Sequence, residues 1–191
     1  MTRFRFKVWN LSSLDIGCGY TSGHIKKGEI GIDLERGLCD VLASAYYLPF
    51  RDFCFRKVIM SHILEHLVDC DKALTEVTRV LTRKGILEIE VPNPHNFGIF
   101  KDILLRKKGF YEASKDHIYA FGENELRNVL QKLNFEIIKL EYVNSSGAEE
   151  KLKKSWLFKR AVHKWIGLVF PEFKTAIRLE CRKLNVSGRN L

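Results

Sequence analysis

The fold is decided by residues 14–20, which read Leu-Asp-Ile-Gly-Cys-Gly-Tyr and close the first apolar run of the chain. Gly17 and Gly19 allow the backbone to bend tightly and to approach a ligand closely. A second apolar run ends in an acid, Asp33, whose carboxylate can accept hydrogen bonds from both hydroxyl groups of a ribose. A glycine-rich turn after one strand, with an acid at the tip of the next, is a nucleoside-binding arrangement of α/β folds.

The ligand is not expected to be a dinucleotide, because the spacing of the glycines and of the acid departs from that fingerprint. The third glycine is Gly23, which makes the pattern G-x-G-x-x-x-G instead of G-x-G-x-x-G. Asp33 also follows the turn sooner than the roughly 20 residues that are usual. The short crossover leaves little helix whose N-terminus could hold a pyrophosphate.

Short apolar runs alternate with helical patterns along the chain, which predicts an α/β fold with a largely parallel sheet. One helix is expected after Asp69, with Gly85 as a left-handed residue at its end, and a second over 123–133, ended by Asn134. The first three strands are joined by short connections, so helical cover should be reduced on that flank of the sheet. The predicted strands are 13–16, 29–34, 41–44, 57–61, 86–91, 135–143 and 176–182.

An ordered series of motifs resembles the class I S-adenosylmethionine-dependent methyltransferases, in the subgroup that acts on small substrates. The motifs are Asp-Ile-Gly-Cys-Gly at 15–19, Leu-Pro-Phe at 48–50, Ser-His-Ile-Leu-Glu-His-Leu at 61–67, Glu76, Arg-Val-Leu at 79–81, and Val-Pro-Asn-Pro at 91–94. The resemblance covers roughly residues 11–143, with a looser echo over 171–183. It implies a Rossmann-like methyltransferase fold, in which a mostly parallel seven-stranded sheet ends in an antiparallel last strand.

The length of 191 residues suits one domain over 1–191. The resemblance implies a cofactor-binding core at 11–143, which leaves a basic helix and the last strand at 144–191. The implied cofactor is S-adenosylmethionine, with Asp33 on its ribose. Ser44 stands where relatives often place an acid that accepts from the adenine amino group, so this contact is neutral or passes to the Ala45 backbone. The predicted cofactor contacts are Asp15, Gly17, Cys18, Gly19, Tyr20, Asp33, Leu34, Ser44, Ala45, Ser61 and His62.

Three histidines are candidates for proton transfer. His62 and His66 follow the fourth predicted strand, where a base could take a proton from the acceptor as it attacks the methyl group. The alternative, which we favour, is that this motif shapes the cofactor pocket and starts the following helix. His117 precedes the second helix on the same side and stays open as a substrate contact. Cys18 is expected to pack in its tight turn, while Tyr20 either covers the sulfonium or is an exposed loop aromatic.

The acceptor is expected to be a small molecule or a lipid-linked or glycan-linked group, held largely by residues 93–116. No Asn/Asp-Pro-Pro-aromatic tetrad follows the fourth strand, which disfavours methylation of the exocyclic amine of a base. No Pro-Cys pair is present, which disfavours cytosine C5 chemistry. Two alternatives stay open: a tRNA or rRNA methyltransferase that uses the basic C-terminal segment, and a non-catalytic cofactor-binding subunit of a methyltransferase complex.

The net charge of +9 falls entirely in residues 151–191, which hold eleven Lys or Arg residues and two Glu. Residues 151–170 have the pattern of a basic amphipathic helix, with Trp156 and Trp165. Such a helix either lies on an anionic membrane surface or packs over the sheet or the substrate pocket, and we favour packing.

Cysteine spacing and the first residues of the chain bear on the compartment. The five cysteines form no C-x-x-C pair and no zinc spacing, so we expect neither a disulfide framework nor a bound metal. The N-terminal stretch has no apolar region of the kind found in secretory signals. These features predict a cytoplasmic protein, with peripheral membrane attachment through 151–170 as the alternative to a purely soluble one.

Overall fold

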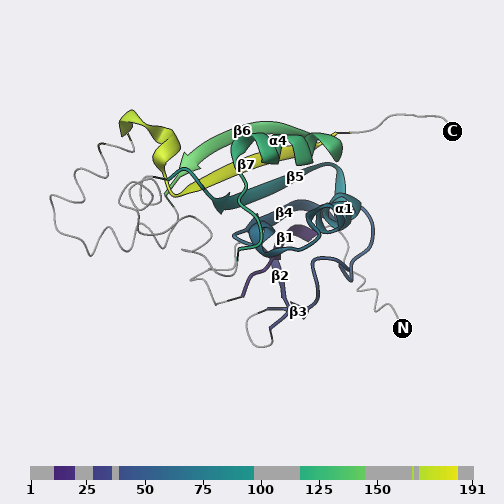
Figure 1. The fold of residues 1–191 in the computed structure, drawn as a ribbon. Helices are drawn as coiled ribbons and strands as arrows, with labels where there is room; N and C mark the ends of the chain where they lie inside the picture. The colour runs from purple at the N-terminus through teal and green to yellow at the C-terminus, as the bar shows by residue number, and fades with distance from the viewer. Residues whose placement is uncertain are drawn as a thin grey trace.

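The computed structural model describes residues 11–19, 28–35, 39–96, 117–144, 165 and 168–184. Within these ranges seven strands form one sheet in the order β3-β2-β1-β4-β5-β7-β6 (Figure 1). β7 pairs antiparallel with both β5 and β6, and the other pairs are parallel. The predicted mostly parallel sheet with an antiparallel last strand is therefore confirmed. The strands are β1 (Leu11–Ile16), β2 (Ile30–Asp33), β3 (Val41–Leu42), β4 (Phe55–Ser61), β5 (Leu81–Pro92), β6 (Phe135–Val143) and β7 (Ala176–Lys183).

Six of the seven predicted strands differ in length from those of the structure, and the differences at β3 and β5 have a visible physical cause. β3 ends at Leu42, two residues early, because Ser44 opens a turn: its hydroxyl oxygen accepts from Tyr46 N at 3.2 Å and its carbonyl from Tyr47 N at 3.1 Å. β5 begins at Leu81, five residues before the predicted start. Its pairing with β4 slips between Phe55 and Lys57, so residues 82–85 bulge out of register.

Helix α1 (Cys70–Val80) begins as predicted, since the Asp69 side chain accepts a hydrogen bond from Lys72 N at 3.0 Å. Its expected end was wrong. The chain becomes extended at Leu81, and Gly85 has no left-handed conformation. Close packing requires a glycine at position 85, because a Cβ there would lie 2.8 Å from Leu81 Cδ2.

Helix α4 (Glu123–Lys132) ends as predicted. Asn134, just beyond the helix, has φ of +59°, the left-handed conformation that favours glycine or asparagine. Two short 3-10 helices complete the described elements, η2 (Leu64–His66) and η3 (Pro171–Phe173).

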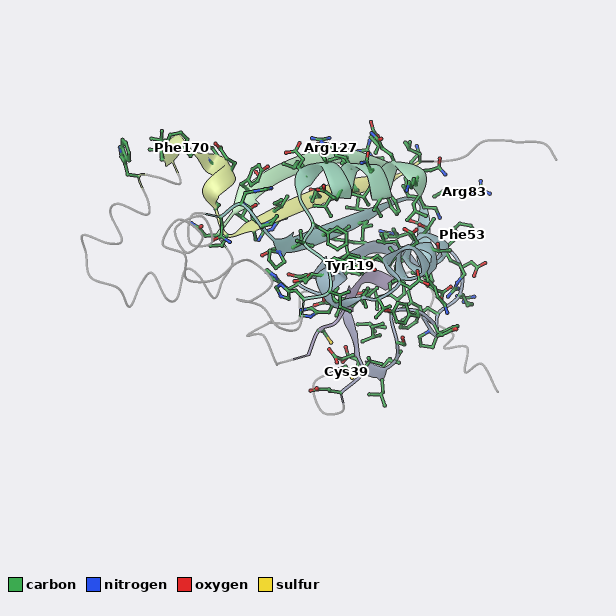
Figure 2. The ribbon with its side chains drawn as sticks, in the orientation of Figure 1. Cys39, Phe53, Arg83, Tyr119, Arg127 and Phe170 are labelled. Atoms are coloured by element: carbon green, nitrogen blue, oxygen red, sulfur yellow. The ribbon has the colours of Figure 1, made fainter. Side chains whose placement is uncertain are left out.

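The two faces of the sheet differ in chemistry. α1 and α4 lie on the same side of the sheet in Figure 1, over a core of fully buried apolar side chains. Alternate residues of the strands point to the other face, as in any pleated strand. On β5 these are Glu88, 2.6 Å from Lys57 Nζ, and Glu90, 2.8 Å from Arg178 Nη2. Figure 2 shows Cys39 at the β3 edge of this sheet and Arg127 on α4 at the β6 end.

The reduced helical cover predicted near the first strands is seen between β2 and β3. Only residues 34–40 join these strands, which is too short for a helical crossover. Most of the connection from β1 to β2 lies outside the described residues, as do most of the predicted helix 151–170 and the pocket residues 97–116. Over the part of the chain that is described, we find no helix that is both long enough and apolar enough to span a bilayer.

Candidate cofactor-binding and active site

The turn after β1 requires both of its glycines. Gly17 has φ of +75°, and its amide and that of Cys18 both donate to Ile32 O, at 2.9 and 3.2 Å. A Cβ on Gly17 would lie 2.9 Å from the Ile63 side chain. The turn thus closes onto β2 on one side and contacts the segment after β4 on the other.

Asp33 is oriented by the same turn. Its Oδ2 accepts from Gly19 N at 2.7 Å, and its Oδ1 accepts from Glu35 N at 3.0 Å. A Cβ on Gly19 would lie only 2.5 Å from Asp33 Oδ2, so any larger residue would displace the carboxylate. Each carboxylate oxygen has a further lone pair for a ribose hydroxyl. The predicted ribose acid is therefore held in position before any ligand binds.

Three other predicted cofactor contacts are buried around this turn. Asp15, Cys18 and Ser61 are each no more than 4% exposed. Burial, with the nearby charges of Asp15 and Asp33, raises the pKa of the Cys18 thiol to about 11. A thiol with that pKa is a poor nucleophile, which supports the interpretation that Cys18 packs.

The remaining predicted contacts lie along the ends of β2 and β3. Leu34 is 73% exposed directly after Asp33, so its side chain is free to contact a ligand. Ala45 is buried, and Ser44 keeps its hydroxyl proton to donate, because its oxygen only accepts from Tyr46. Tyr20 lies outside the described residues. Asp40, which sequence analysis did not single out, anchors β2 by accepting from Gly31 N at 2.7 Å.

His62 lies at the carboxyl end of β4 between two buried acids. Its Nδ1 is 3.5 Å from Glu65 Oε1 and its Nε2 is 3.3 Å from Glu90 Oε1. Burial lowers the pKa of His62, but the contacts with the two carboxylates raise it more, to about 9. An imidazole that is protonated at neutral pH cannot accept a proton, which argues against His62 as the base.

The other two candidate histidines meet at Glu65. The rings of His66 and His117 are 4.8 Å apart in an edge-to-face arrangement, and His66 Nε2 is 4.0 Å from Glu65 Oε1. Ile118 N and Tyr119 N donate to the Glu65 carbonyl, at 2.9 and 3.2 Å. These bonds join the segment before α4 to η2, so all three predicted histidines lie at one edge of the sheet.

The sequence places Glu65 between His62 and His66, but the second acid beside His62, Glu90, was not singled out. Glu90 is 4% exposed and accepts from Arg178 Nε and Nη2, at 3.1 and 2.8 Å. In the sequence it is one of two acids that alternate with apolar residues in β5, a pattern that indicates only a polar strand face. The expectation that no metal is bound was based on the spacing of the cysteines. It did not consider Glu65, His66 and His117, whose possible ligand atoms lie close together in the structure.

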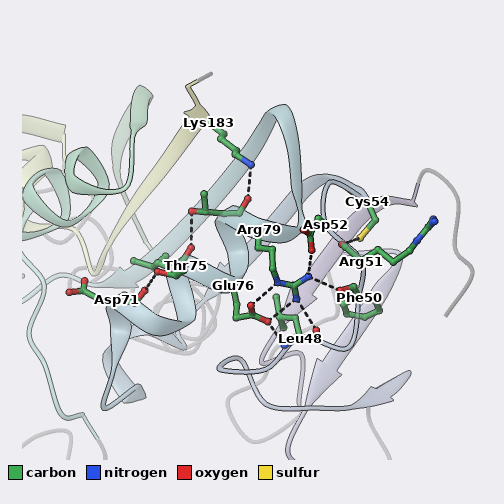
Figure 3. Close-up of polar contacts among 12 residues, drawn as sticks. Leu48, Phe50, Arg51, Asp52, Cys54, Asp71, Thr75, Glu76, Arg79 and Lys183 are labelled. Carbon is green, nitrogen blue, oxygen red and sulfur yellow. Dashed lines mark hydrogen bonds and ion pairs between the residues drawn. The ribbon is translucent and has the colours of Figure 1, made fainter. Parts of the chain in front are cut away.

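Another set of motif residues forms a clamp away from the cofactor turn (Figure 3). Arg79 donates to both carboxylate oxygens of Glu76, to Asp52 Oδ1 and to the carbonyl oxygens of Leu48 and Phe50, at 2.7–3.0 Å. Glu76 Oε2 in turn accepts from Leu48 N at 2.8 Å. We call these side chains the Arg79 clamp: they fix the Leu-Pro-Phe loop onto α1, and their role is structural.

Asn93 has a similar structural role at the end of β5. It is fully buried, and its Nδ2 donates to the carbonyl oxygens of Glu172 and Lys174, at 2.5 and 2.7 Å. The Val-Pro-Asn-Pro motif therefore joins β5 to η3 and β7. Of the acceptor pocket predicted at 93–116, only 93–96 are described.

Two family models, both described as a methyltransferase domain, match this chain over residues 14–89 and 54–140. Together they span the glycine-rich turn, the histidine cluster and most of the sheet. Both matches identify a methyltransferase domain in this chain within residues 14–140. They support the resemblance to the class I S-adenosylmethionine-dependent methyltransferases, a family whose cofactor is S-adenosylmethionine.

The curated relatives are themselves uncharacterized. One protein of Methanocaldococcus jannaschii is 33% identical over 118 residues, which are 54% of this chain and 48% of the relative. The chain thus spans about half the length of that protein.

Solved structures share the fold at low sequence identity. A SAM-dependent methyltransferase from Archaeoglobus fulgidus has a TM-score of 0.60 and 20% identity, with 92% of this chain and 87% of that one covered. A Thermotoga maritima enzyme described as a possible histamine N-methyltransferase has a TM-score of 0.63 and 18% identity, with 90% and 82% covered. A chain of the Haloferax volcanii complex that contains the Trm112 methyltransferase activator has a TM-score of 0.60 and 12% identity, with 95% and 85% covered.

Proposed function

We propose that the protein transfers the methyl group of S-adenosylmethionine to an oxygen, nitrogen or carbon atom of a small-molecule, lipid-linked or glycan-linked acceptor. The observation that carries this proposal is the position of His66 and His117 beside the cofactor turn. Ile63, which contacts the Gly17 position, lies in the same segment as His66. A proton acceptor at this edge can act where the methyl group is transferred.

The chain's own residues support each part of the reaction. Asp33 would hold the ribose, the Gly17–Gly19 turn the methionine end, and Ser44 with Ala45 the adenine. The acceptor's lone pair then forms a bond to the methyl carbon as the carbon–sulfur bond breaks, and the electron pair stays on sulfur. Holding the two reactants in line contributes much of the rate of such a transfer, and His66 or His117 would take the acceptor's proton.

A labelling screen tests the acceptor class. The full chain is incubated with methyl-labelled S-adenosylmethionine and three panels: small hydroxylated molecules and amines, glycolipids in vesicles, and unmodified tRNA and rRNA. We expect transfer in one of the first two panels, with a rate that His66→Gln lowers by at least about 10-fold. Glu125→Gln, on the exposed start of α4, is the matched control and should leave the rate unchanged.

Label in the RNA panel alone would contradict the proposed acceptor class in favour of the RNA alternative. Transfer that is seen only after a Trm112-like activator is added would instead indicate a partner-dependent enzyme, as the Haloferax volcanii complex suggests. No transfer in any panel, with or without such an activator, would favour a non-catalytic cofactor-binding subunit.

A lipid-linked acceptor has separate support from the C-terminal region. Trp165, Leu168, Val169 and Phe170 are all exposed apolar side chains, and they lie within the segment 151–191 that carries the whole net charge. Basic residues near an anionic bilayer contribute about 1 kcal/mol each. Sedimentation with anionic vesicles should exceed that with neutral vesicles, and Trp165→Ser with Leu168→Ser should reduce it. Equal binding to both vesicle types would remove the membrane from this proposal.

A further inference from the structure

The Glu65 carboxylate is the most unusual polar group of the described chain. It is 1% exposed, and neither of its oxygens accepts a hydrogen bond. The nearest groups are His62 Nδ1 at 3.5 Å and His66 Nε2 at 4.0 Å, both beyond good hydrogen-bond geometry. An ionised carboxylate buried in this way costs several kcal/mol unless it is compensated, and the one cation beside it in the described chain, His62, makes no hydrogen bond to it and is shared with Glu90.

The surroundings of Glu65 are the donor set of a metal site. One ligand atom from each of Glu65, His66 and His117 lies within 4.8 Å of the other two. Two imidazole nitrogens and one carboxylate oxygen suit a first-row transition metal and form a common catalytic zinc site, which keeps a position open. Zinc–ligand bonds are about 2.0–2.2 Å long, so the ligand atoms would have to move about 1 Å closer to one another. Rotations of the two histidine side chains can supply this movement.

The backbone around these donors is already fixed. The Glu65 carbonyl accepts from Ile118 N and Tyr119 N, and His66 N donates to Ile63 O at 3.1 Å. Tyr119 OH donates to Val68 O at 3.0 Å, which adds a second connection between the two segments. Residues more than 50 positions apart in the chain are therefore held together without any ligand, as a preorganised site requires.

We propose that Glu65, His66 and His117 bind one divalent transition-metal ion, with Zn²⁺ as the best match to the donor set. Three protein ligands leave at least one position open, on the side of the sheet edge where the acceptor is expected. This last point rests on the proposed function. A hydroxyl group of the acceptor bound at that position would lose its proton more easily, because a bound cation lowers the pKa of its ligands.

The metal thus defines the acceptor as one that presents a hydroxyl group. With the metal bound, His66 and His117 would be ligands and no longer proton acceptors, so the proton of this hydroxyl group would pass to solvent water and not to a histidine. The hydroxyl oxygen would bond to the methyl carbon as the carbon–sulfur bond of the sulfonium breaks. The electron pair stays on sulfur, so the step needs no oxidant or reductant.

Metal binding is tested without any acceptor. The full chain is treated with a chelator, dialysed, and titrated with Zn²⁺ by calorimetry and with Co²⁺ by visible absorption. We expect one equivalent of metal to bind. Metal affinity should fall by at least about 100-fold in each of three variants, Glu65→Gln, His66→Gln and His117→Gln. Loss of a residue that only supports a metal ligand typically lowers the affinity by about 10-fold to 100-fold. His95→Gln, which changes an exposed histidine outside the donor set, should leave it unchanged.

The variants must be shown to fold, so circular dichroism and binding of S-adenosylhomocysteine are measured for each. If a variant does not fold, the Co²⁺ spectrum of the wild type decides. An intense band typical of four-coordinate or five-coordinate Co²⁺ supports the site, and the spectrum of aqueous Co²⁺ overturns it. Equal zinc affinity in the wild type and in all folded variants also overturns it.

Failure of the site and failure of the proposed function give different results. If one equivalent of metal binds at Glu65 but no acceptor is methylated, the proposed function is contradicted and the metal site is still supported. If the protein binds no zinc and a chelator does not affect methyl transfer, the metal site is contradicted and the proposed function is still supported.

Discussion

Glu76 and Glu65 belong to the same stretch of family motifs, but their carboxylates have opposite hydrogen-bonding environments. Glu76 belongs to the Arg79 clamp, in which both of its oxygens accept hydrogen bonds and one guanidinium is fully used (Figure 3). Glu65 lies more deeply buried, and neither of its oxygens accepts a hydrogen bond. A carboxylate whose oxygens all accept hydrogen bonds stabilises the fold, whereas one whose oxygens accept none is available to a ligand.

The clamp predicts the largest effect on stability. Arg79→Ala removes all the hydrogen bonds of the guanidinium and leaves the Glu76 carboxylate without its charged partner. We expect the free energy of unfolding to fall by about 3 kcal/mol, measured by urea denaturation. Arg127→Ala is the matched control. It breaks an exposed pair with Glu123 on α4 and should cost less than about 0.5 kcal/mol. Equal losses in the two variants would mean that the clamp is not structural.

Asp33 stands between the two cases, because its carboxylate accepts two backbone hydrogen bonds and is still open to a ligand. Asp33→Ala should weaken S-adenosylmethionine binding by about 10-fold to 100-fold, which corresponds to 1–3 kcal/mol. The measurement is a calorimetric titration, with Glu136→Ala on the exposed side of β6 as the control. An unchanged affinity in Asp33→Ala would place the ribose elsewhere.

Glu65→Gln sharpens the comparison with the clamp. The amide has nearly the same shape and no charge to desolvate, and His62 keeps its ion pair with Glu90, so we expect the free energy of unfolding to change by less than about 1 kcal/mol. The same urea titration as for Arg79→Ala provides the measurement. A loss as large as that of Arg79→Ala would mean that Glu65 stabilises the fold as Glu76 does.

The smallest effect is expected at Cys18. With its pKa raised to about 11, about 1 thiol in 1,000 is ionised near pH 8, against about 1 in 4 for a free cysteine. Iodoacetamide should therefore leave Cys18 unmodified in the folded chain and modify it after denaturation, as followed by mass spectrometry. Rapid modification in the folded state would indicate a reactive thiol in the cofactor turn.

Much of the fold could be predicted from the sequence, because it depends on local patterns. The strand at Phe135–Val143, the cap of α1 at Asp69 and the left-handed Asn134 follow from alternation, capping and turn chemistry. The end of α1 could not be predicted. Gly85 is typical of a helix end in the sequence, but β5 pairs with β4 from Leu81 onward, and this long-range pairing decides where the helix stops.

The sequence singles out the residues of the candidate site but does not show their surroundings. The glycines and Asp33 carry a short motif, and the three histidines were singled out from their places in the chain. Neither pattern shows that the Glu65 carboxylate is buried without hydrogen bonds, or that Glu65 and Glu90 together hold His62 as a cation. Those facts arise from contacts between segments that are far apart in sequence.

The most direct test of this account is a calorimetric titration of S-adenosylmethionine into the wild-type chain. The account predicts saturable binding of one equivalent, with S-adenosylhomocysteine competing for the same site and Arg127→Ala binding as the wild type does. A folded wild-type chain that shows no binding of either compound at millimolar concentrations would contradict it.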